Sequence, residues 1–220
     1  MIKYKICVFL LFLFSLTSIG YVSAKKNPID LLGKVIYIDA GHGGLDPGAM
    51  YKNIKEKDIN LSLSLKLEDV LSHYGAIVYQ TRYGDYDLSV TNTINRKRSD
   101  LSRRSNIINK SQCDLFVSIH LNAENSETWS GPQVFYDDIN SENEEIAKII
   151  QEELNKELKS HREYKITNDM YLQKRIERPG VLIEVGFLSN PNDRYLLQKD
   201  EYQDKVVNTI SKAIIKYFNN

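Results

Sequence analysis

Short runs of β-branched and aromatic residues alternate along this chain with longer stretches whose apolar residues have helical spacing. Strands and helices that alternate in this way pack as layers, with helices on both faces of a mostly parallel sheet. The alternation therefore predicts an α/β fold, a single domain of three layers (α/β/α). The predicted strands are residues 34–39, 76–81, 114–121, 132–136 and 181–186, and the predicted helices are residues 56–74, 95–110, 141–161, 192–198 and 201–218.

Local signals mark the ends of several predicted elements. Gly75 directly follows the first predicted helix and is a typical helix stop. Ser141 and Glu144 have the spacing of a capping box, which predicts that Ser141 begins the third helix. Residues 122–131 are polar and are predicted to be a loop, which carries the single tryptophan of the chain, Trp129.

Residues 1–24 differ in composition from the rest of the chain. A short basic stretch is followed by an apolar run over residues 6–16, and Val22 and Ala24 precede a candidate cleavage point. A charged start, an apolar middle and a small-residue end predict an export signal, either a cleaved signal peptide or an uncleaved signal anchor. We therefore expect residues 25–220 to work outside the cytoplasmic membrane, with membrane contact only through the N-terminal segment.

Composition and charge narrow the class of protein. The chain has 42% hydrophobic and 26% charged residues, which is ordinary for a globular domain. After residue 24 there are 27 basic and 29 acidic side chains, because two of the 29 basic residues lie in the N-terminal segment. This balance argues against nucleic acid as the main partner. Cys7 lies in that segment and Cys113 stands alone, so no disulfide framework is expected.

Four polar residues stand where α/β folds bind ligands, at the carboxyl ends of strands and in the turns that follow. His42 lies in a glycine-rich turn after the first predicted strand, and Glu56 begins the next helix. His120 ends the third predicted strand. Glu184 interrupts the apolar run of residues 181–187, where a buried carboxylate is costly unless it is paired or near a metal.

Each of these residues also has a purely structural interpretation. A histidine after a strand is commonly a loop residue that makes one hydrogen bond, and acidic residues are common at helix starts. Glu184 could face solvent, because side chains alternate between the two faces of a strand.

Taken together, the four residues favour a catalytic metal site over four separate structural roles. Two imidazoles and one carboxylate are the protein ligands of a catalytic zinc site, and a second carboxylate can take a proton from water and deliver it to a leaving group. The other two histidines, His73 and His161, lie near helix ends and are expected at the surface.

Four segments carry motifs in a definite order. They read VIYIDAGHGGLDPGA (residues 35–49), KEKDINL (55–61), DLFVSIHLNA (114–123) and PGVLIEVGFLSNPND (179–193). Their four key positions are separated by 14, 64 and 64 residues. In order and spacing they resemble the zinc-dependent N-acetylmuramoyl-L-alanine amidases of the Amidase_3 family, and the resemblance covers residues 33–218.

The resemblance implies a reaction and a site. Enzymes of this family hydrolyse the amide between N-acetylmuramic acid and L-alanine of the stem peptide in peptidoglycan. Carried over by motif, the ligands of one Zn²⁺ per chain fall on His42, Glu56 and His120. The catalytic acid falls on Glu184. Residues 25–220 are accordingly expected to form the catalytic domain.

The resemblance also points to residues outside the four key positions. The residues expected to help shape the site are Arg82, Arg104 and Asn109. Arg103 is the alternative to its neighbour Arg104. Trp129 and Tyr171, both in predicted loops, either pack against the domain or stack on sugar rings of the substrate.

In its short length and its N-terminal signal, this chain is similar to the germination-specific amidases of spore-forming bacteria. Those enzymes remove stem peptides from spore-cortex peptidoglycan, which allows muramic-δ-lactam to form. The resemblance implies that the protein is located in the intermembrane space of the forespore or in the cortex. Because the sequence shows no targeting module, an accessory protein is a candidate partner.

Three other functions remain open on the sequence. The enzyme could act on the vegetative cell wall as an autolysin. Glu56 and Glu184 could be the carboxylate pair of a glycosidase, although the two site histidines would then be unexplained. The chain could also be a zinc-loaded wall-binding protein without activity, although the intact Glu184 argues against this.

Overall fold

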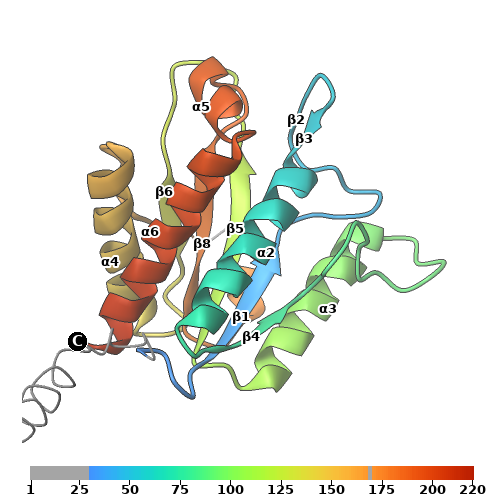
Figure 1. The fold of residues 1–220 in the computed structure, drawn as a ribbon. Coiled ribbons are helices and arrows are strands. Elements are labelled where there is room, and N and C mark those ends of the chain that lie inside the picture. The colour runs from blue at the N-terminus through green and yellow to red at the C-terminus, as the bar shows by residue number, and fades with distance from the viewer. Residues whose placement is uncertain (1–29, 168–169) are drawn as a thin grey trace, which may run out of the picture.

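The main sheet contains six strands in the computed structural model, which describes residues 30–167 and 170–220. Helices cover both faces of the sheet, so the predicted α/β/α fold is confirmed (Figure 1). The predicted export signal, residues 1–24, lies outside the described residues. In spatial order the strands are β4 (Ile77–Gln80), β1 (Val35–Ala40), β5 (Leu115–Asn122), β8 (Gly180–Phe187), β6 (Gln133–Tyr136) and β7 (Lys165–Ile166).

Helices of unequal length connect these strands. The helices are α2 (Glu56–His73), α3 (Arg96–Ser111), α4 (Asn143–Leu158), α5 (Pro191–Leu196) and α6 (Asp200–Phe218), with a 3₁₀ turn η2 (Gln173–Arg175) before β8. α2 ends as the sequence predicts, because Gly75 follows it with a positive φ of 91°. No helix among the described residues is both long and apolar enough to span a membrane.

The two faces of the sheet bury cores of different size. α2, α4 and α6 pack on one face, where Leu115, Val117 and Ile119 of β5 belong to the large apolar cluster. α3 and η2 lie on the other face, where Phe116 belongs to a smaller cluster. Because side chains alternate along a strand, His120 projects from β5 on the α3 face, like Phe116.

The carboxyl ends of three central strands meet at one edge of the sheet. β1, β5 and β8 are parallel to one another, whereas β6 is antiparallel to β8 and therefore begins at that edge. Figure 1 shows α5 and the small hairpin of β2 (Met50–Tyr51) and β3 (Ile54–Lys55) at this same end of the molecule. This edge therefore collects the turns in which the sequence places its candidate site residues.

The capping box predicted at Ser141 is wrong. α4 begins at Asn143, and its N-cap residue, Glu142, makes no side-chain capping bond. The Asn140 side chain accepts a hydrogen bond from the Glu142 N–H at 2.9 Å, so a turn occupies the position where a helix start was predicted. The helix also ends before His161, because Lys159 adopts a left-handed conformation with a φ of 55°.

Candidate active site

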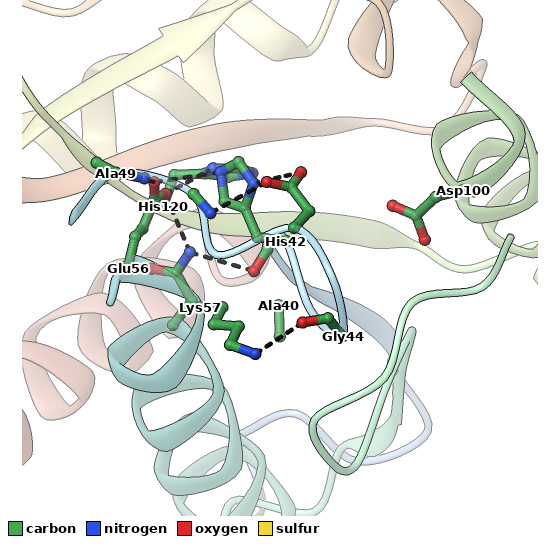
Figure 2. A network of polar contacts seen from close by, with 12 residues as sticks. Ala40, His42, Gly44, Ala49, Glu56, Lys57, Asp100 and His120 are labelled. Carbon is green, nitrogen blue, oxygen red and sulfur yellow. Dashed lines mark hydrogen bonds and ion pairs between the residues drawn. The ribbon is translucent and has the colours of Figure 1, made fainter. Parts of the chain in front are cut away.

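Three side chains from separate elements meet at the carboxyl edge of the sheet. His42 follows β1, Glu56 is the first residue of α2, and His120 lies in β5. His42 Nε2 is 3.2 Å from Glu56 Oε2, and His120 Nδ1 is 3.1 Å from Glu56 Oε1 (Figure 2). One ligand atom from each residue lies within 4.8 Å of the other two, so the group could hold a metal ion.

Glu56 is held in place by its own turn and by β5. Its Oε2 accepts a hydrogen bond from the Ala49 N–H at 2.8 Å, and its Oε1 accepts one from the Leu121 N–H at 2.9 Å. Asn60, one turn along α2, donates to Oε1 at 3.1 Å. Burial alone would raise the pKa of Glu56, but the two histidines lower it far below the ordinary range of a carboxyl group. The side chain is therefore an ionised carboxylate.

Asp46 fixes the orientation of the His42 ring. Its Oδ2 is 2.9 Å from His42 Nδ1, and its Oδ1 accepts a hydrogen bond from the Gly48 N–H at 3.1 Å. Burial opposes protonation of His42, but Glu56 and Asp46 raise its pKa above the ordinary value. A neutral ring that donates its Nδ1 proton to Asp46 presents the lone pair of Nε2 to the centre of the group. Sequence reasoning missed Asp46; its position four residues after His42 was the signal.

Two glycines let the backbone approach the three side chains. A Cβ atom on Gly41 would lie 2.3 Å from the His120 ring. A Cβ atom on Gly48, whose φ is +66°, would lie 2.5 Å from Glu56 Oε2 and 2.7 Å from the His42 ring. Any larger residue would therefore push the donor atoms apart.

Glu184 lies beside this group on the neighbouring strand. It is the register partner of His120 across the β5–β8 pair, so both side chains project on the α3 face. Its Oε2 is buried and has no hydrogen-bond partner. Burial raises the pKa of Glu184 to about 7, with His120 opposing the rise and Glu56 adding to it. A carboxyl group in this state can both take up and release a proton near neutral pH.

A cleft of about 450 Å³ opens over these residues on the α3 face. The side chains that line it include His42, His120, Glu184, Leu101, Tyr171 and Leu172. The Tyr171 hydroxyl is 3.0 Å from the Ser102 hydroxyl, so the segment before η2 contacts α3. The cleft gives a ligand access to both the His/Glu/His group and Glu184.

The donor set fits a catalytic zinc ion. Two imidazole nitrogens and one carboxylate are three ligands of the kind that such sites use, and Asp46 supplies the outer carboxylate that typically orients a ligating histidine. The cleft and Glu184 lie on the open side, where a catalytic site keeps a position for water. The residues present are therefore compatible with the metal that the sequence implied.

Arg104 and Arg82 hold the turn after β1 in place through hydrogen bonds to its carbonyl oxygens. Arg104 is buried and donates to the carbonyl oxygens of Ala40 at 2.7 Å and His42 at 2.6 Å. Arg82 donates to Ala40 O at 2.9 Å and Gly41 O at 3.0 Å. Arg103 is exposed, so Arg104 is the arginine that contacts the site turn.

Asn109 does not lie with the other candidates. Its side chain donates to Arg175 O at 2.7 Å and accepts from the Glu177 N–H at 2.9 Å, which fixes the segment before β8. Trp129 lies on the loop between β5 and β6 and lines a different cavity. His73 and His161 are exposed, as predicted.

Fold and site together have the form of a metal-dependent hydrolase, with ligands and a free carboxyl group at the carboxyl edge of a parallel sheet. The chain belongs to the Amidase_3 family of N-acetylmuramoyl-L-alanine amidases, whose model matches residues 36–216. The family that the motifs resembled is therefore confirmed.

Individual relatives agree with this assignment. The chain is 45% identical over 215 residues to the germination-specific N-acetylmuramoyl-L-alanine amidase of Bacillus subtilis (strain 168), covering 96% of this chain and 91% of the relative. The CwlD amidase from Clostridioides difficile, solved in complex with the GerS lipoprotein, is 41% identical with a TM-score of 0.80, covering 84% of this chain and 98% of that one. A second N-acetylmuramoyl-L-alanine amidase, from Clostridium difficile 630, is 30% identical with a TM-score of 0.76, covering 85% and 97%.

Proposed function

We propose that this protein hydrolyses the amide bond between N-acetylmuramic acid and L-alanine in peptidoglycan, with zinc held by His42, Glu56 and His120. The observation that carries the proposal is the juxtaposition of this compact donor group with Glu184, a buried carboxyl group without a partner. Membership of the amidase family supports the choice of substrate bond.

Glu184 acts as the general base and acid. Zinc, when bound, supplies Lewis-acid chemistry that polarises the scissile carbonyl and makes water more acidic. Glu184 takes a proton from the attacking water through its free Oε2 and then delivers that proton to the nitrogen of the departing L-alanine. A pKa near 7 suits both steps, because the group is neither a strong acid nor fully protonated at neutral pH.

The remaining residues hold these groups in place. Asp46 keeps the His42 ring in the tautomer that leaves Nε2 free. Arg104 and Arg82 fix the carbonyl oxygens of the turn that carries His42. The open cleft suits a polymeric substrate, since a sugar strand can lie across it while the stem peptide enters.

A role in the spore cortex follows from the relatives. The relative at 45% identity is a germination-specific amidase, which supports a role in the spore cortex, and the amidase at 41% identity was solved with a lipoprotein, which supports an accessory protein as partner. Residues 1–24 are then the export signal and residues 25–220 the catalytic domain. Deletion of the gene is expected to give spores without muramic-δ-lactam; normal lactam content would favour a vegetative autolysin.

A metal count tests the site directly. Purified residues 25–220 are expected to bind about one zinc ion per chain, and His42→Ala is expected to lose both zinc and the release of stem peptides. Activity that survives chelation and produces new reducing ends would favour the glycosidase alternative. Zinc binding without any turnover, even with an accessory protein added, would favour the non-catalytic alternative.

A further inference from the structure

A second cavity of about 440 Å³ lies at the carboxyl edge of the sheet, near the C-terminal end of α4. The β5–β6 loop forms one wall, residues 159–162 after α4 form another, and single residues of α4, α5 and α6 complete it. The side chains that line it include Trp129, Leu158, Ser160, Arg162, Asp193 and Tyr202. None of these residues belongs to the catalytic cleft described above.

Trp129 lines this cavity and is partly open to solvent. Its side chain is 51% exposed, although it is the largest apolar group of the loop. The guanidinium group of Arg162 covers it, with the carbon of that group 4.9 Å from the ring centre. A half-exposed indole held by an arginine has a fixed plane and an open surface, which is the arrangement used to stack a flat ligand.

Arg162 is itself fixed on its other sides. It donates a hydrogen bond to Gln133 Oε1, and its guanidinium group also lies over the Phe187 ring at 5.1 Å. Its Nε atom is buried and has no hydrogen-bond partner within the described chain. Because that atom is enclosed by the protein, any contact between Arg162 and a ligand is made by the terminal nitrogens of the guanidinium group.

The loop that carries Trp129 is tied down at its end. Asp193 Oδ2 accepts hydrogen bonds from the Gly131 N–H at 2.8 Å and from the Phe187 N–H at 3.0 Å. A Cβ atom on Gly131, whose φ is +81°, would lie 2.7 Å from the Ser160 hydroxyl oxygen. The aromatic surface, the hydroxyl of Ser160 and the carboxylate of Asp193 therefore keep constant positions relative to one another.

The cavity lies at the same edge of the sheet as Glu184, but on the side that α4 and α6 cover. His120, Glu184 and Gln133 are register partners across β5, β8 and β6. Arg162 contacts the last of the three. Because neighbouring strands lie about 4.8 Å apart, the second cavity begins one to two strand widths from the proposed acid/base group. A polymer that crosses this edge of the sheet can therefore reach both the cavity and the cleft on the α3 face.

We propose that this second cavity binds a sugar ring of the glycan strand, stacked on Trp129. A sugar ring has an apolar C–H face and a rim of hydroxyl and amide groups. The exposed part of the indole matches the former, and Arg162, Ser160 and Asp193 supply donors and acceptors for the latter. The inference rests on the proposed function for the identity of the polymer, and it assigns to the cavity the part that holds the glycan while the stem peptide is cut.

The single tryptophan makes the binding test specific, because all indole fluorescence of the protein comes from Trp129. Peptide-free glycan strands of alternating N-acetylglucosamine and N-acetylmuramic acid are titrated into the whole protein. A saturable change in indole emission is expected. These strands contain no amide to the stem peptide, so binding is measured independently of hydrolysis.

Calorimetric titration of the same strands into variants supplies the affinity. Trp129→Ala is expected to weaken binding by about two- to tenfold, which corresponds to the free energy of one aromatic contact. Trp129→Phe is expected to retain most of the wild-type affinity. Tyr195→Ala serves as the matched control, because Tyr195 is 60% exposed on α5 outside the cavity.

Two outcomes would overturn the glycan assignment. One is an unchanged emission spectrum together with equal affinities of the wild type and Trp129→Ala. The other is a change in emission caused by free stem peptides and not by glycan strands, which would assign the cavity to the peptide. Glycan binding by a protein that releases no stem peptides would instead contradict only the proposed function.

Discussion

Two buried carboxyl groups on the α3 face of the sheet have opposite environments. Asp39 in β1 accepts hydrogen bonds from Arg104, Thr81 and Ser118, all between 2.6 and 2.8 Å. Glu184 in β8, two strands away, leaves Oε2 without any partner. Burial raises the pKa of both, but Arg104 and the Ser118 hydroxyl bring that of Asp39 down to about 2, whereas that of Glu184 reaches about 7.

The difference separates a group that holds the fold from a group that is free to react. Burial is common to both residues, so the local donors decide the protonation state. A carboxylate with all its acceptors filled is a fixed anchor for the turn after β1. A carboxyl group with an empty oxygen and a pKa near neutrality has the properties of a proton carrier. Substitutions at the two places are therefore expected to affect different measurements.

The largest effect is expected for Glu184→Gln. Removing the proton carrier should lower kcat for stem-peptide release by a factor of about 10² to 10⁴. Zinc content and thermal stability should be retained, because the amide keeps the shape of the side chain and Oε2 has no hydrogen bond to lose. Amidase assays on purified peptidoglycan and metal analysis of the same sample measure the two effects.

The control for this prediction is His42→Ala, which should lose zinc as well as activity. Turnover of Glu184→Gln within about tenfold of the wild type would show that another group moves the proton.

Next in size is the effect of Arg104→Met on stability. Loss of the guanidinium group leaves Asp39 and Asp100 buried without their charged partner, which should cost about 3–5 kcal/mol in the free energy of unfolding. The matched control is Arg103→Met, the adjacent exposed arginine, which should change stability by less than about 0.5 kcal/mol. Denaturant unfolding of both variants checks the pair, and equal losses would remove the distinction between the two arginines.

A smaller effect is expected from acid. The pKa of Asp39 is about 2 in the folded chain against 3.8 as its ordinary value, so its contribution to stability is present above about pH 4 and is lost as the pH falls through about 2. The difference corresponds to about 2 kcal/mol. Unfolding free energies measured between pH 5 and pH 2 should therefore fall more steeply for the wild type than for Asp39→Asn. Parallel curves would mean that Asp39 is not the anchor described here.

The smallest effect is expected for Asn109→Ala. The side chain joins α3 to Arg175 and Glu177 at partly exposed positions, so its loss should cost about 1 kcal/mol in stability. The contact lies outside the cleft, and kcat should change by less than about twofold. A large loss of activity without loss of stability would place Asn109 in the site after all. Thermal unfolding and the amidase assay separate these results.

The sequence predicts the central strands of the sheet well, because β5 and β8 are apolar runs of eight residues each. The hairpin of β2 and β3, the strand β7 and the turn η2 were not predicted, since each contains two or three residues and has no measurable periodicity. The start of α4 was misplaced because the side chains of Ser141 and Asn140 can both accept a bond from a nearby N–H group, and the sequence does not show that Asn140 is the one that does so.

Three of the four key residues stood out because each departs from its local pattern, whereas Glu56, at an ordinary helix start, was assigned through the family motif. Glu184 stands in an apolar strand and the two histidines stand at strand ends, and these are features that a sequence displays. Asp46 was missed, because a carboxylate in a turn is ordinary until a partner such as His42 is seen beside it. Whether Arg103 or Arg104 reaches the turn after β1 depends on the rotation of α3 about its axis. Neighbouring residues point about 100° apart around a helix, so only one of the two can face that turn.

The proposed ligands of the metal lie 14 and 64 residues apart along the chain and come together only where β1, α2 and β5 meet. An unfolded chain therefore offers no comparable site, and zinc bound there shifts the folding equilibrium by mass action. A free zinc concentration one hundred times the dissociation constant adds about 2.7 kcal/mol to the free energy of unfolding. On the proposed function, the amount of folded enzyme thus depends on the zinc available where the enzyme works.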